Sequence, residues 1–123
     1  MKQLLVAAHG SRRASSNEDL SALVASVTPN LGENFDGVSA AFLEFASPSI
    51  EEKLTELFEQ GATEVVVLPY FLSAGNHVVR DIPNIVDSVM SEFPGKKVNL
   101  LSHIGAFEAM SGVIVAASQL AKD

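Results

Sequence analysis

The chain has 123 residues, a length typical of one domain, and we expect residues 1–123 to form a single globular domain. Its net charge of −7 argues against a nucleic-acid-binding surface, and no stretch approaches the roughly 20 consecutive apolar residues that a membrane helix needs. Because cysteine is absent, disulfides and thiolate metal sites are excluded, and the cytoplasm is the expected compartment.

The first predicted elements are a strand and a helix. Residues 4–8 form a continuous apolar run, which is typical of a buried strand. Residues 17–27 follow with helical spacing, and Ser15 with Glu18 predicts a capping box at the start of this helix. The residues expected to face the core are Leu20, Leu23, Val24 and Val27.

A second strand is predicted at residues 38–45. Ser47 is then expected to cap a helix in which Pro48 takes the first helical position. This helix extends to residue 60, and Gly61 ends it. Its expected core residues are Ile50, Leu54, Leu57 and Phe58.

The third strand is predicted at residues 64–69, which include three consecutive valines. A loop rich in glycine and serine leads from it to a helix over residues 82–92. We expect Asp81 to be the N-cap of that helix, preceded by a loose turn from His77.

The last strand and helix are predicted at residues 97–101 and 107–121. The helical residues expected to point inward are Met110, Val113, Ile114 and Ala117. Strands that alternate with helices indicate an α/β fold, a three-layer αβα domain in which helices cover both faces of a four-stranded, mainly parallel sheet. The strand order 2-1-3-4 is expected because it places the two most apolar strands in the centre.

Polar side chains follow the strands at the edge where such sheets bind ligands. His9 follows the first strand, Glu44 lies near the end of the second, and His77 and His103 come after the third and fourth. Neutral imidazole with carboxylate is a ligand set suited to iron, cobalt, nickel or zinc. Each residue also has a plain structural reading. His9 can be bonded to a loop carbonyl, and Glu44 can point outward at a sheet edge. His77 can be an exposed histidine in the first turn of a helix, and a solvated loop explains His103 better than a site does.

Three arginines lie near this edge and are candidates for binding anions, although each is also an ordinary surface residue. They are Arg12, Arg13 and Arg80. The chain has no G-x-S-x-G elbow, no phosphate-binding loop and no G-x-G-x-x-G run, so hydrolase and nucleotide-binding motifs are missing.

Three segments together resemble the CbiX/SirB family of class II tetrapyrrole chelatases. They are residues 9–12 (HGSR), residues 42–50 (FLEFASPSI) and residues 68–83 (LPYFLSAGNHVVRDIP), in the family's order and spacing. The resemblance implies a chelatase-like half-domain and a sirohydrochlorin chelatase that inserts Co²⁺, or Fe²⁺ or Ni²⁺, without ATP or a cofactor. Longer members contain two such halves, so the resemblance also implies a homodimer that rebuilds the cleft between them.

The resemblance assigns the metal to His9 and His77 and a proton-relay or metal-delivery role to Glu44. Metal insertion releases two pyrrole protons, and histidine near neutral pH serves as ligand or as proton acceptor. The residues expected to bind the tetrapyrrole are Ser11, Arg12, Arg13, Tyr70, Ser73, Gly75, Asn76 and Arg80. No role carries over to His103.

Two other functions remain open on the sequence. One is a non-catalytic carrier of metal or tetrapyrrole that uses the same histidines and shows no turnover. The other is a phosphate-ester-binding or hydrolytic module built on Gly10, Ser11 and Arg12, which the missing phosphate-binding loop disfavours.

Overall fold

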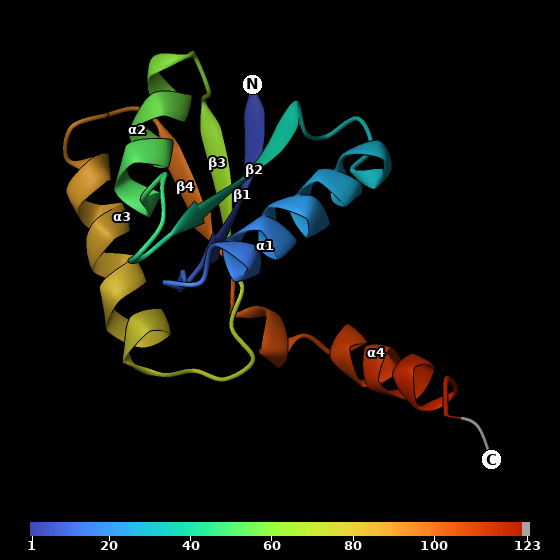
Figure 1. Cartoon of the computed structure of the whole chain (residues 1–123). Helices are drawn as coiled ribbons and strands as arrows, with labels where there is room; N and C mark the ends of the chain where they lie inside the picture. Colours follow the sequence, from blue (N-terminus) through green and yellow to red (C-terminus); the bar gives the residue numbers. More distant parts are fainter. Residues whose placement is uncertain (122–123) are drawn as a thin grey trace.

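The computed structural model describes residues 1–121. Its centre is a four-stranded sheet in which neighbouring strands are all parallel, in the order β2-β1-β3-β4 (Figure 1). The strands are β1 (Lys2–Ala8), β2 (Gly37–Phe42), β3 (Glu64–Pro69) and β4 (Lys97–Leu100). The predicted α/β fold and strand order are therefore confirmed.

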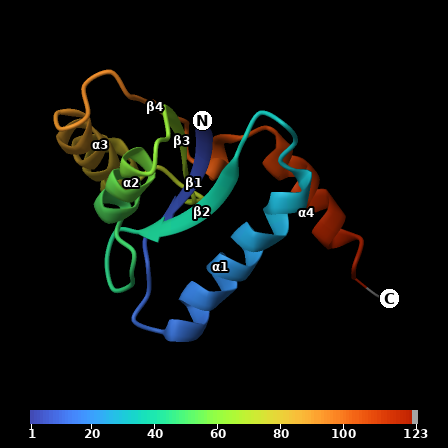
Figure 2. The ribbon, with the colours of Figure 1, turned by 90° about the horizontal axis from the view of Figure 1, so that it is seen from above.

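Helices cover the two faces of the sheet unequally. They are α1 (Ala14–Val27), α2 (Ile50–Glu59), α3 (Ile82–Met90) and α4 (Ala109–Ser118). Helix α1 lies on one face, while α2 and α3 lie side by side on the other (Figures 1 and 2). No helix within residues 1–121 is long and apolar enough to cross a membrane.

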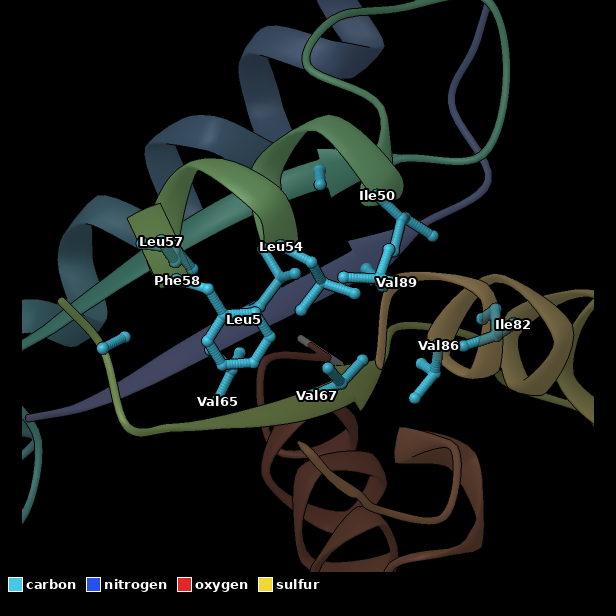
Figure 3. Packing of buried hydrophobic residues seen from close by; sticks show 13 residues of the cluster. Leu5, Ile50, Leu54, Leu57, Phe58, Val65, Val67, Ile82, Val86 and Val89 are labelled. Carbon is cyan, nitrogen blue, oxygen red and sulfur yellow. The ribbon is translucent and has the colours of Figure 1, made fainter. Parts of the chain in front are cut away.

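The alternation of side chains along β1 divides the core in two. Leu5 and Ala7 point toward α2 and α3, whereas Val6 and Ala8 point toward α1. Figure 3 shows the larger cluster, in which Leu5 and Leu54 are completely buried. Replacing such a leucine with alanine typically costs about 2–5 kcal/mol in free energy of unfolding, so this cluster stabilises the fold as a whole.

The predicted capping residues of α1 and α2 are wrong. Helix α1 begins at Ala14, so Ser15 lies inside its first turn and forms no capping box with Glu18. The capping box of α2 consists of Ser49 and Glu52, each accepting a hydrogen bond from the other's backbone N–H. The two side chains together satisfy two otherwise unpaired N–H groups in this way, which favours a helix start after the cis peptide Ser47–Pro48.

The strand predicted at residues 38–45 ends at Phe42. Phe45 has a φ of 64°, which no extended strand accommodates, so the chain turns there. Helix α3 is preceded by a π-helical turn (His77–Asp81) that continues directly into it. Asp81 therefore precedes α3 as predicted, but its side chain makes no capping hydrogen bond because its backbone is already helical.

Helix α4 differs most from expectation. The predicted inward positions Val113 and Ile114 are 56% and 67% exposed, and no residue of α4 is buried. After the 3-10 turn Ile104–Ala106 the chain extends away from the sheet, so α4 does not pack against it (Figure 1). A strongly apolar helix is thus left without cover in the single chain.

Candidate metal-handling site

The first two strands bring His9 and Glu44 together. His9 directly follows β1, and the segment after β2 continues alongside it through the hydrogen bonds Leu43 N–H to Ala8 O (2.9 Å) and Glu44 N–H to His9 O (3.0 Å). As a result, Nε2 of His9 lies 3.2 Å from Oε2 of Glu44. The backbone ladder, rather than side-chain packing, sets this pairing.

Gly10 makes the close approach of the two segments feasible. Its φ is +92°, and a Cβ at this position would lie 1.9 Å from the backbone oxygen of Glu44. Any side chain at residue 10 would therefore push the Glu44 segment away from His9. The His-Gly pair is a local requirement of the site.

His77 enters the same site from the π-helical turn. Its ring lies edge-on to that of His9, with 4.7 Å between the ring centroids. Its Nδ1 lies 2.8 Å from Oδ2 of Asp81, one turn further along the chain. The structure thus brings together His9, Glu44 and His77, all three predicted from the sequence, and adds Asp81.

The hydrogen bond of His9 defines what its other ring nitrogen offers. Nδ1 lies 2.9 Å from the carbonyl oxygen of Gly10, which only accepts, so Nδ1 carries the proton. In neutral His9, Nε2 then presents a lone pair to the Glu44 carboxylate. Both groups, 3.2 Å apart, offer electron pairs to the space between them, an arrangement that suits a metal cation.

The site is open to solvent. The side chains of His9 and Glu44 are 39% and 49% exposed, and those of His77 and Asp81 are 43% and 41% exposed. Within residues 1–121, no three histidine or acidic side chains lie together in an arrangement that could hold a metal ion. Imidazole and carboxylate are nevertheless the ligand types that suit iron, cobalt, nickel or zinc.

A hollow of about 370 Å³ adjoins His77 and Glu44. It is lined by Leu43, Glu44, His77, Asp81, Asn84 and Ile85. Its volume is at the small end of the range for small-molecule sites, which is roughly 300–1,000 Å³.

Phe45 forms an exposed aromatic wall beside His9. Its ring centroid is 6.0 Å from that of His9, and the guanidinium carbon of Arg12 lies 4.8 Å above its face. Phe45 is 51% exposed and is the one residue other than glycine with a positive φ in the described part of the chain. A bulky residue in this conformation is strained, which is common at functional sites.

Some of the predicted substrate-binding residues lie close to this centre. Ser11 is fixed by Asn17, whose amide accepts from its backbone N–H and donates to its carbonyl. Tyr70 lines a second hollow with Gly10 and Ser11. Arg80 is 67% exposed, with Nε 3.9 Å from the Asp81 carboxylate.

The other predicted residues are less closely tied to the centre. Arg13 is the N-cap of α1, with its side chain exposed. Ser73, Gly75 and Asn76 lie in the exposed loop between β3 and the π-helical turn. His103 follows the edge strand β4, two strands from β1 in the sheet order.

The structure also reveals two residues that the sequence reasoning missed. Asp81 was assigned to helix capping, although its i,i+4 spacing from His77 was a usable signal for a side-chain contact. Phe45 was assigned to a strand, and no local pattern indicated its positive φ.

Comparison with known proteins shows the family to which the chain is similar. The model of the CbiX family matches residues 3–120. The chain is 32% identical over 111 residues to a chloroplastic sirohydrochlorin ferrochelatase of Arabidopsis thaliana, covering 90% of this chain and 48% of that protein. It is 33% identical over 94 residues to a sirohydrochlorin cobaltochelatase of Methanococcus aeolicus, covering 75% of this chain and 63% of the relative. The chain thus spans about half to two thirds of the length of these relatives.

A solved structure shows the same fold. The sirohydrochlorin chelatase SirB of Bacillus subtilis subspecies spizizenii, in complex with cobalt, superposes with a TM-score of 0.81 at 25% identity. The match covers 98% of this chain and 51% of SirB. With the family model matching nearly every residue, the chain belongs to the CbiX family.

Proposed function

We propose that this protein is a sirohydrochlorin chelatase that inserts a divalent metal, with Co²⁺ as the first candidate and Fe²⁺ or Ni²⁺ as alternatives. The observation that carries the proposal is the meeting of two histidine rings 4.7 Å apart with a carboxylate 3.2 Å from one of them. The names of the relatives, which include both cobaltochelatases and ferrochelatases, support the same reaction class.

In this proposal the metal ion is a substrate and the protein supplies ligands and proton acceptors. Inserting M²⁺ breaks two pyrrole N–H bonds, forms metal–nitrogen bonds and releases two protons. His9 and His77 hold the ion and accept protons in turn as it is transferred to the macrocycle. Glu44, in contact with Nε2 of His9, relays these protons toward solvent, to which it is half exposed. The reaction changes no oxidation state and requires no further cofactor.

The tetrapyrrole is held by charge and by the walls of the site. Its peripheral carboxylates suit Arg12, Arg13 and Arg80, because a guanidinium binds a carboxylate in bidentate fashion. Ser11, Tyr70, Ser73, Gly75 and Asn76 contribute to substrate binding from the neighbouring loops. These assignments follow the placement of the residues at the edge of the sheet where the strands end.

We also propose that two copies of the chain form the complete cleft. The macrocycle is roughly 15 Å wide, and sites of that size commonly lie between domains, whereas the hollow beside His77 holds about 370 Å³. Helix α4 exposes Val113, Ile114 and Val115, and such an apolar face is more stable when a partner covers it.

The test is a turnover assay with sirohydrochlorin in large excess over protein, followed by absorbance with Co²⁺, Fe²⁺ and Ni²⁺ in separate reactions. A chelatase forms many equivalents of metallated product, faster than the uncatalysed reaction. Formation of one equivalent of tightly bound product, with no further turnover, would indicate the carrier instead. No acceleration with any of the three metals would reject the proposed enzyme.

A further inference from the structure

We propose that Asp81 is a positioning residue that fixes the tautomer of His77 and thereby directs the lone pair of Nε2 toward the incoming metal ion. This inference rests on the proposed function, because the ion concerned is the one to be inserted. Asp81 does not contact the metal in this role. It acts only through the imidazole of His77.

The first argument is the chemistry of the contact. Oδ2 of Asp81 lies 2.8 Å from Nδ1 of His77, a normal length for a hydrogen bond to a charged acceptor. An ionised carboxylate only accepts, so Nδ1 must carry the proton. In neutral His77 the lone pair then lies on Nε2, the nitrogen that remains free to bind a metal.

The second argument is how the fold holds the acceptor. Asp81 is the last residue of the π-helical turn, and Ile82, which follows it, is completely buried at the start of α3. The backbone of Asp81 is therefore anchored to the core. Single π-helical turns occur frequently at functional sites, and this one places residues 77 and 81 on the same side.

The two histidines differ in the group that holds Nδ1. His9 is bonded to the neutral carbonyl of Gly10, whereas His77 is bonded to a carboxylate. A carboxylate partner makes imidazole a stronger donor and fixes the orientation of its ring. His77 is thus the stronger of the two metal ligands, and Asp81 is the reason.

The test compares Asp81→Asn with Asp87→Asn in the full-length protein. Both substitutions remove one negative charge and keep side-chain size, but Asp87 is exposed on α3 and lies outside the hollow. The asparagine amide at position 81 can donate as well as accept, so it no longer imposes one tautomer. Circular dichroism checks that each variant is folded.

Two measurements test the proposed role of Asp81. The first is Co²⁺ affinity by calorimetry, which we expect to fall about 10–100-fold in Asp81→Asn and to stay unchanged in Asp87→Asn. The second is the tautomer of His77 by ¹⁵N-edited NMR without metal, expected to be Nδ1–H in the wild type and mixed in Asp81→Asn. Unchanged affinity and tautomer in Asp81→Asn, or an equal loss of affinity in Asp87→Asn, would overturn the proposal.

These outcomes separate the inference from the proposed function, since neither measurement requires turnover. If wild-type protein fails to metallate sirohydrochlorin but the two readouts change as expected, the chelatase proposal fails and the role of Asp81 stands. If turnover occurs and the readouts of Asp81→Asn match those of the wild type, the role of Asp81 fails alone.

Discussion

At the scale of single residues, the conformation of Phe45 is costly and therefore informative. A bulky side chain at φ 64° stores about 1–3 kcal/mol of strain, and asparagine tolerates this region far better. Replacing Phe45 with asparagine would release this strain but would also remove the contact with Arg12, which offsets about 0.5–1 kcal/mol of the gain in stability. We expect Phe45→Asn to raise the free energy of unfolding by about 1 kcal/mol in urea denaturation.

If Phe45 also forms a wall for the macrocycle, the same variant will have a higher KM for sirohydrochlorin. The matched control is Phe107→Asn, because Phe107 is another exposed aromatic residue but has an ordinary φ of −76°. Phe107→Asn is expected to bring no gain in stability. A Phe45→Asn variant that is less stable than the wild type would refute the strain argument.

The placement of His9, Glu44 and His77 was predictable because the carboxyl ends of parallel strands converge. The distances between them were not predictable. The contact of Glu44 with His9 depends on a backbone ladder that continues past β2, and on the positive φ of Gly10. These features depend on tertiary structure, and no repeating pattern of residues in the sequence predicts them.

At the scale of elements, the capping box of α2 makes stability depend on pH. The backbone and side-chain hydrogen bonds of Ser49 hold the pKa of Glu52 below its ordinary value of 4.5. A carboxyl whose pKa is lower in the folded state stabilises the fold above its unfolded pKa, and this contribution is lost as pH falls through the folded pKa. The expected loss thus begins near pH 4.5 and continues below it.

We therefore expect Glu52→Gln to flatten the dependence of unfolding free energy on pH below about pH 5, measured by denaturant titration at each pH. Glu51→Gln is the control, since Glu51 lies in the same first turn without the capping contact. An equal pH slope in the wild type and Glu52→Gln would contradict this role of the capping box.

The elements themselves were predicted better than their ends. β3 has the predicted bounds, and all four predicted core residues of α2 are buried. The start of α3 was predicted correctly, but those of α1 and α2 were wrong. Ser15 with Glu18 matches the capping-box pattern although α1 already begins at Ala14, and Ser47 with Pro48 resembles a helix start although the capping box of α2 is Ser49 with Glu52. Local sequence does not determine which residues form a capping box, since this depends on the residue at which the preceding strand ends.

At the scale of the whole molecule, the parallel direction of the strands followed from the alternation of strands and helices, and their order followed from placing the two most apolar strands in the centre. The position of α4 relative to the sheet could not be predicted from the sequence. Its apolar residues are distributed around the helix, a pattern that indicates burial but does not identify the surface that buries it. In a single chain this surface is solvent-exposed.

The proposed homodimer predicts that α4 is covered by a second copy. Ile114→Asp, at a position 67% exposed in the single chain, is expected to shift the protein from dimer to monomer in size-exclusion chromatography with light scattering. Leu23→Asp on α1 makes the same chemical change at a site 47% exposed and should leave the dimer intact. A monomeric wild-type protein, or a dimer that Ile114→Asp does not weaken, would contradict the proposed interface.

The most direct test of the metal-handling site is the initial rate of Co²⁺ insertion into sirohydrochlorin by the wild type and by His9→Ala, His77→Ala, Glu44→Gln and His103→Ala. We expect the rate to fall at least about 100-fold in the first three variants, because each removes a ligand or proton acceptor, and to stay near wild type in His103→Ala. Wild-type rates in His9→Ala and His77→Ala, with the fold intact, would show that metal insertion does not occur where β1, β2 and β3 end.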